Sequence, residues 1–156
     1  MMDNHYAPPK ANVVDAPVGS EPAPALWNPN AAASWSLLFS TIFGSYLHWK
    51  NEERIGDARR TAAARNWFFA SVAVVGLSVA FAIMGPRTGE ATGRGLNLVY
   101  LLAWYFAAAK PQAKYVQEHY GSGYPRRGWF APILAAIGLV IVISVGAGVL
   151  FGLSRL

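Results

Sequence analysis

The chain has 156 residues, a formal net charge of +5 and no cysteine. Hydrophobic residues make up 54% of it and charged residues only 13%, about half the charged share of an ordinary soluble domain. The composition therefore excludes disulfides and cysteine chemistry, and it disfavours a soluble fold, which needs charge on the outer face of each helix. Charges are absent from four long stretches, which lie between residues 21 and 50, 65 and 87, 94 and 110, and 127 and 155.

The first thirty residues differ from the rest. They hold six of the ten prolines and show no hydrophobic periodicity. Such a segment buries too little apolar surface to offset the entropy lost on ordering it. We predict a disordered or extended tail over residues 1–30 and one helical membrane domain over residues 31–156.

Four apolar segments follow the tail, and each predicts a helix. Residues 131–153 carry no charge and would form a helix of about 34 Å, which is enough to cross a hydrocarbon core of roughly 30 Å. Residues 67–84 are nearly as apolar. The segment over residues 95–110 is short for a membrane span, but the basic side chains that flank it can reach the headgroups. A glycine-rich loop over 85–95 suits a tight turn between the two helices. Together with residues 31–49, these segments predict an all-α integral membrane protein, a bundle of four hydrophobic helices.

The first of these segments, residues 31–49, is ambiguous. Its strongly apolar residues are offset by five Ser or Thr, so insertion of this helix alone is marginal. It crosses the membrane, is re-entrant or lies in the interface, and we take crossing as the working hypothesis.

Small residues recur every four positions in the first and last helices. They let helix backbones approach closely in lipid, so we predict that the two rows pack together; such rows also suit a homo-oligomer or a second membrane protein. The rows are Ala32, Ser36, Ser40 and Gly44, and Ser144, Gly148 and Gly152.

Basic residues are distributed unevenly between the loops. Nine of the thirteen Lys and Arg lie in segments 50–66 and 110–128, and four lie elsewhere. By the positive-inside rule these two segments face the cytoplasm. The tail is then outside if the first segment crosses, and it stays in the cytoplasm if that segment is re-entrant or interfacial.

Aromatic and basic residues gather at the ends of the apolar segments. Tryptophans at the ends of membrane helices anchor them at the level of the headgroups. We predict this role for Trp27, Trp49, Trp67 and Trp129, which lie at the ends of the apolar segments. Over residues 112–130, tyrosines alternate with basic residues, which predicts a belt that binds anionic lipid or, alternatively, a platform for a protein partner. The members of this second group are Lys114, Tyr115, Tyr120, Tyr124, Arg126 and Arg127.

Two strings carry a resemblance to a known family. They are WNPNAAASWSLLFSTIFGSYLHWKN at 27–51 and LLAWYFAAAKPQAKYVQEHYGSGYPRRGWFAPIL at 101–134. The chain, over roughly residues 26–153, resembles a family of small inner-membrane proteins of proteobacteria that carry a domain-of-unknown-function label. The resemblance implies a location in the bacterial cytoplasmic membrane, with several passes, and it implies no activity.

No motif in the sequence predicts chemistry. The histidines, His5, His48 and His119, have no partner at metal-ligand spacing, and no phosphate-binding loop or nucleophile elbow is present. We expect no catalytic, cofactor or metal site and no nucleic-acid partner. The sequence favours an accessory or scaffold protein that contacts anionic lipid and a membrane-protein partner or a second copy. The alternative is a lipid-interacting or pore-type protein, such as a small channel or an immunity factor against a membrane toxin.

Overall fold

The computed structural model describes residues 22–84 and 88–153, and within these ranges every regular element is a helix. An isolated bridge between Leu26 and Arg126 is the one strand-like contact found there. The all-α class is thereby confirmed. Residues 1–21 of the predicted tail lie outside the described residues. The elements are α1 (Pro29–Phe39), α2 (Thr41–Ile55), α3 (Ala58–Met84), α4 (Thr88–Trp104), the π-helical turn η1 (Tyr105–Ala109), α5 (Lys110–Tyr120) and α6 (Phe130–Leu153).

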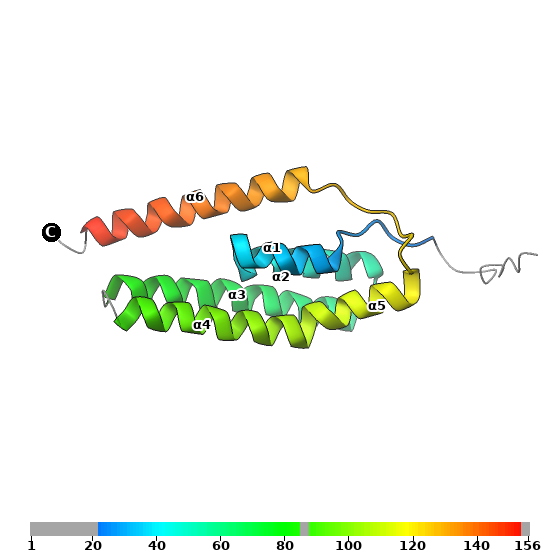
Figure 1. Cartoon of the computed structure of the whole chain (residues 1–156), viewed down its shortest axis with the longest axis horizontal. Helices are drawn as coiled ribbons and strands as arrows, with labels where there is room; N and C mark the ends of the chain where they lie inside the picture. Colours follow the sequence, from blue (N-terminus) through cyan, green and yellow to red (C-terminus); the bar gives the residue numbers. More distant parts are fainter. Residues whose placement is uncertain (1–21, 85–87, 154–156) are drawn as a thin grey trace, which may run out of the picture.

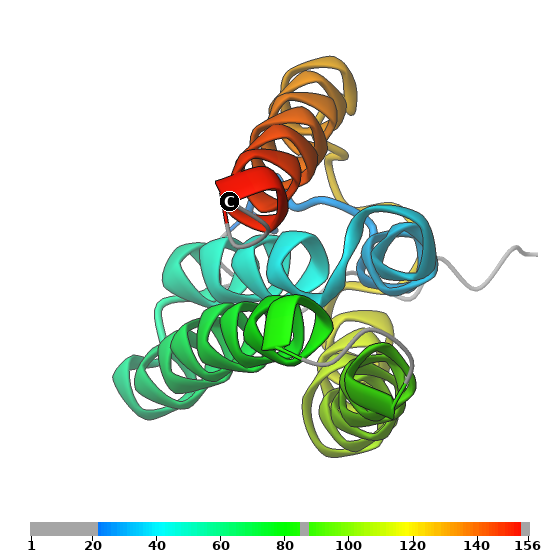
Figure 2. The same ribbon diagram turned by 90° about the vertical axis from the view of Figure 1, so that its left-hand side faces the viewer.

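The predicted single helix over 31–49 is instead a hairpin of two helices. Asn28 caps α1 by accepting hydrogen bonds from the amides of Asn30 and Ala31. The chain then turns at Ser40, whose φ of 146° is rare for a residue with a side chain. Ser36 and Gly44, four residues to either side of the turn, are in contact, so α2 runs back beside α1 (Figures 1 and 2). The two helices measure only about 16 and 22 Å at 1.5 Å per residue.

Several hydroxyl groups of this hairpin are bonded locally, whereas the Ser40 hydroxyl is buried without a partner among the described residues. Ser36 donates to the carbonyl of Ala32 and Ser45 to that of Thr41, each four residues back along its own helix. Ser45 also bonds the hydroxyl of Ser71 on α3, at 2.7 Å. The Ser36 and Ser45 hydroxyls, which weaken insertion of a lone helix, are therefore satisfied within their own helices, and Ser45 also joins the hairpin to α3.

A long antiparallel pair forms the body of the structure. The helix α3 has 27 residues and spans about 40 Å, and α4 returns alongside it (Figure 1). Helix α4 starts at Thr88, earlier than predicted, because the glycines assigned to a loop lie at its contact with α3. A Cβ on Gly93 would come within 2.8 Å of the Ser78 carbonyl oxygen, and Ser78 donates to the Gly93 carbonyl. Close packing of small residues thus occurs between α3 and α4.

The last helix lies apart from the others. Helix α6 has 24 residues, about 36 Å, and runs along one side of the molecule with little contact (Figures 1 and 2). Only Pro132 and Ala136 are buried on it, and a Cβ added at Gly148 or Gly152 would have no atom within 4 Å.

The predicted packing of the two small-residue rows is therefore corrected. Ser36 and Gly44 are in contact within the hairpin, and Ala32 is buried in one cluster with Phe43 and Leu47 of α2, because the turn at Ser40 folds the row onto itself. Ser144 is exposed, and a Cβ added at Gly148 or Gly152 would meet no atom within 4 Å, so close packing of this row against the first row is not seen in the described residues.

Within residues 22–84 and 88–153, two helices are long and apolar enough to cross a membrane, over Ala58–Ala82 and Phe130–Leu153. The rest of the chain covers little of these two helices. In the most apolar stretch of each, 17% of α3 and 6% of α6 is buried. The core lies instead at one end, where the hairpin, α5 and the base of α6 meet, and its largest fully buried side chains include Trp104, Leu26 and Leu47. The end with this core is also the end that carries the two basic segments.

Candidate functional site

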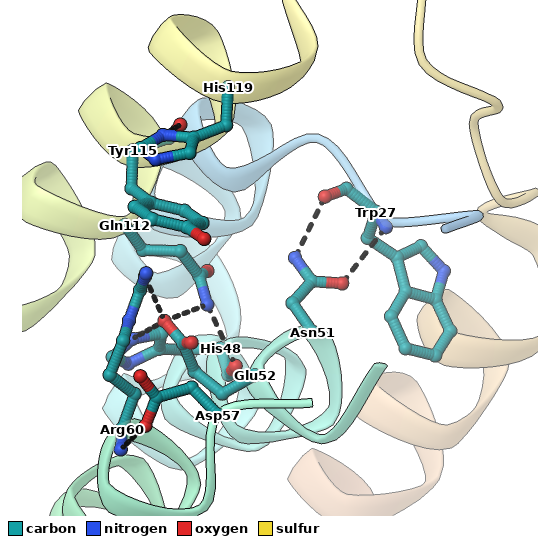
Figure 3. Close-up of polar contacts among 9 residues, drawn as sticks. All are labelled: Trp27, His48, Asn51, Glu52, Asp57, Arg60, Gln112, Tyr115 and His119. Carbon is teal, nitrogen blue, oxygen red and sulfur yellow. Dashed lines mark hydrogen bonds and ion pairs between the residues drawn. The ribbon is translucent and has the colours of Figure 1, made fainter. Parts of the chain in front are cut away.

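A buried carboxylate is the centre of the most unusual group of side chains. Glu52, near the end of α2, is 2% exposed. Its Oε1 accepts hydrogen bonds from the guanidinium of Arg60 at 2.8 Å and from the amide of Gln112 at 2.9 Å, and it lies 3.5 Å from His48 Nε2 (Figure 3). The four side chains come from α2, α3 and α5, so the cluster joins two consecutive helices to α5, whose Gln112 is 60 positions from Glu52 in sequence.

Local structure explains how these residues converge. His48 and Glu52 are one turn apart on α2 and face the same side. The left-handed Gly56, with φ 87°, ends α2 and turns the chain so that the first turn of α3 brings Arg60 back over Glu52. Gln112 lies in the first turn of α5 and also donates to the His48 carbonyl at 3.0 Å.

The environment of Glu52 favours its charged form. Burial alone raises the pKa of this carboxyl, but hydrogen bonds from His48 and Gln112 and the positive charge of Arg60 outweigh burial and hold the pKa below its ordinary value. The carboxylate is therefore ionised at neutral pH. A cavity of about 200 Å³ lies beside the cluster, between α2, α3 and α5.

The cluster is not fully satisfied within the described residues. Glu52 Oε2 and His48 Nδ1 are buried without a hydrogen-bond partner there. In residues 22–84 and 88–153, no three His, Asp or Glu side chains lie close enough together to hold a metal ion. The arrangement is suited to binding a water molecule or a small hydrogen-bonding group, and its donors and acceptors lock α2, α3 and α5 together.

A second polar contact fixes the segment that precedes α1. Asn51, fully buried, accepts from the backbone amide of Trp27 at 3.0 Å and donates to its carbonyl at 2.9 Å (Figure 3). The Trp27 indole in turn donates to the carbonyl of Gly128. Leu26 exchanges backbone hydrogen bonds with Pro125 and Arg127. Leu26 and Trp27, assigned to the tail from the sequence, are thus fixed to α2 and to residues 125–128, and Ala23 packs against the cluster that contains Leu26.

The structure divides the predicted interfacial residues into two groups. Trp27 and Tyr124 are buried in the core, with the guanidinium of Arg127 3.6 Å from the centre of the Trp27 ring and that of Arg126 5.8 Å from the Tyr124 ring. The others are less buried than these two, and Lys114 is exposed.

The less buried aromatic residues contact other rings or basic side chains. Tyr115 lies between Arg60, at 3.7 Å, and His119, at 3.8 Å. Trp49 packs on Phe68, with the Lys50 ammonium 4.4 Å from its ring. Of the remaining residues, Trp67 pairs with Tyr100, Tyr120 meets the edge of Tyr115, Lys114 pairs with Glu118, and Trp129 packs at the edge of the core.

Four residues of this cluster and of the neighbouring contact were not predicted as site residues from the sequence: Asn51, Glu52, Arg60 and Gln112. A signal was present: His48, Asn51 and Glu52 occur at i, i+3 and i+4 directly after an apolar run, which places three polar side chains on one helix face. The burial of this face could not be predicted, because the sequence does not reveal that α5 covers it.

Comparisons with known proteins assign no family to the chain. No family model, curated protein or solved structure matches it. The resemblance to small proteobacterial membrane proteins therefore stays a prediction, and the function is argued from the geometry alone.

Proposed function

We propose that this chain is a multi-pass protein of the bacterial inner membrane, in which α3, the continuous α4–η1 helix and α6 cross the bilayer. The α1–α2 hairpin enters from the cytoplasmic side and returns to it. Each arm of the hairpin is shorter than the roughly 30 Å of a hydrocarbon core. The hairpin begins and ends beside the basic segments, since Trp27 bonds both Asn51 and Gly128.

The proposed role is that of an accessory or scaffold protein without chemistry of its own. One observation carries it: α6, the most apolar helix, has almost no cover within the chain, yet it is joined to an end that polar contacts hold rigid. A bare helix on a fixed base can pack against a second membrane protein or another copy. Small residues at Ser144, Gly148 and Gly152 suit close helix contact of that kind.

Crosslinking tests this role. The chain has no cysteine, so Gly148→Cys and Ala136→Cys give single thiols on the bare and the packed parts of α6. After purification in mild detergent, we expect Gly148→Cys to crosslink to one defined protein, another copy included, and Ala136→Cys to remain unlinked. A Gly148 thiol that reacts with no protein in the intact membrane contradicts the proposal. Ion flux through liposomes that contain only this protein would favour the pore-type alternative.

Thiol labelling of intact cells tests the topology. Ala91→Cys, in the first turn of α4, is expected to react with an impermeant reagent from outside. Pro22→Cys and Ser122→Cys, which flank the basic end, are expected to react only after the membrane is opened. Labelling of Pro22→Cys from outside would mean that the first segment crosses, and the re-entrant arrangement would be wrong.

A further inference from the structure

The lipid-interacting alternative is supported by a groove that none of the predictions from sequence included. It runs between α2, α3 and α6 and has a volume of about 620 Å³, within the range of pockets that hold small molecules. Thirteen residues line it, and Tyr46 is the one with a polar side chain. The rest is apolar, so the interior of the groove suits a hydrocarbon ligand.

Basic residues surround the polar end of this groove. Tyr46, Lys50 and Arg54 are spaced four apart and share one face of α2. The Lys50 ammonium lies 5.9 Å from the centre of the Tyr46 ring. Arg127 lies near the same groove, because its guanidinium is 3.6 Å from the centre of the Trp27 ring and Trp27 packs with Phe43 and Ala136, which line the groove. Consistent with this position, burial and then the positive charge of Arg54 lower the pKa of Arg127.

The charge at this end is not neutralised by the described chain. Lys50 is paired with Glu53 at 2.7 Å. Among residues 22–84 and 88–153, Arg54 and Arg127 have no acidic partner within 4 Å. Two guanidinium groups that repel each other at the end of an apolar groove are complementary to an anion with a hydrocarbon tail. Guanidinium groups bind phosphate oxygens in a bidentate manner, and basic pockets at the cytoplasmic ends of membrane helices bind anionic headgroups.

We propose that this groove binds one anionic phospholipid, with an acyl chain between α3 and α6 and the phosphate between Arg54 and Arg127. The inference rests on the membrane placement proposed above, because the open side of the groove then faces the bilayer. A second copy is a poor occupant of the groove, since an apolar helix packed there would leave the charges of Arg54 and Arg127 without an anion. A soluble anion would leave the apolar length of the groove unfilled.

Lipid titration of the purified protein tests the proposal. The full chain in neutral detergent is titrated with phosphatidylglycerol, phosphatidylcholine or inorganic phosphate, and bound lipid is counted by native mass spectrometry while thermal unfolding is followed in parallel. We expect one phosphatidylglycerol to bind and to raise the unfolding temperature. Phosphatidylcholine should bind far more weakly, and phosphate alone should have no effect. Equal stabilisation by phosphate would overturn the lipid assignment in favour of a free anion.

Two independent variants locate the site. Arg54→Gln should weaken phosphatidylglycerol binding about fivefold, as expected from the loss of one cation near an anionic headgroup; Arg59→Gln, an equal charge change on an exposed residue of α3, should not. Gly76→Leu should block the groove, because Gly76 lines it and a Cβ there has no atom within 4 Å. Gly95→Leu, outside the groove, is its control.

Equal losses in Arg54→Gln and Arg59→Gln would mean general surface charge, and undiminished binding in Gly76→Leu would mean that the groove is not used; either result overturns the proposal. The crosslinking of Gly148→Cys does not depend on these outcomes, so the accessory role and the lipid site fail separately.

Discussion

Gly44→Ala tests the closest packing in the hairpin. A methyl group on Gly44 would overlap the hydroxyl of Ser36, and it would lie 2.7 Å from Cη2 of Trp104 and 3.0 Å from Cβ of Ser36. Rotation of the Ser36 hydroxyl does not relieve this, because its Cβ and the Trp104 ring remain and both residues are almost completely buried. The helices α1 and α2 must therefore separate, or Trp104 must be displaced.

The size of the effect follows from two opposing terms. Overpacking of a filled core costs about 1–3 kcal/mol, and contact with two buried groups places this site in the upper half of that range. Replacing a helical glycine by alanine returns about 1 kcal/mol. The net loss is about 1–2 kcal/mol, which corresponds to a fall of roughly 3–6 °C in the unfolding temperature of a chain of this size.

Thermal unfolding in detergent, followed by circular dichroism, measures this loss. Gly148→Ala is the matched control, since its Cβ meets nothing within 4 Å, and it should unfold at the wild-type temperature or slightly above. Ser36→Ala should restore part of the loss when combined with Gly44→Ala. Unfolding of Gly44→Ala at or above the wild-type temperature would refute the close contact of α1 with α2.

Three further predictions concern the polar end of the hairpin. Glu52→Ala should destabilise the fold by about 2–4 kcal/mol, because it leaves buried donors unpaired. Its control, Glu53→Ala, lies on the exposed face and should change stability by less than about 0.5 kcal/mol. Similar effects of both substitutions would argue against the buried cluster. The pKa of Glu52 is lowered in the folded state, so the charged carboxylate stabilises the fold fully above the ordinary pKa of about 4.5, and this stabilisation is lost as the pH falls below that value. Melting temperatures measured from pH 6 to 3.5 should therefore fall more steeply in the wild type than in Glu52→Gln. Parallel curves for the two proteins would contradict this. Asn51→Ala should free the backbone of Trp27 and make residues 22–28 sensitive to limited proteolysis, and unchanged protection would show that other contacts hold this segment.

The long helices could be predicted from sequence because lipid-compatible helices need long apolar runs without charge. The runs at 67–84 and 131–153 correspond to the later part of α3 and to nearly all of α6. Helix α3 begins nine residues before its predicted start, at Ala58 instead of 67. Its first turns are rich in Arg, and hydropathy alone does not distinguish a charged helical turn from a loop.

The break at Ser40 could not be predicted in the same way. No Gly or Pro lies at the turn, and Ser40 holds its positive φ because contacts on both sides of the turn, such as that of Gly44 with Ser36, fix the two helices. The candidate site could not be predicted for a similar reason. Three of its polar residues share a helix face in the sequence, but their burial depends on Gln112 and the rest of α5, which the chain places there only through the fold.

The separation in sequence between the hairpin and its partners sets the order in which the molecule can be assembled during synthesis. The Trp27–Asn51 and Glu52–Arg60 bonds join residues 24 and 8 positions apart, so they can form early. The Gln112 bond to the His48 carbonyl spans 64 positions, and the Trp27 bond to Gly128 spans 101.

At roughly 5–20 residues per second, the ribosome completes that last span about 5–20 s after Trp27 is made. Throughout this interval the hairpin has only part of its polar contacts, whereas α3 can reach its full length and form its internal hydrogen bonds without later partners. The α1–α2 hairpin is thus synthesised before the other described helices and is among the last of them to be completed.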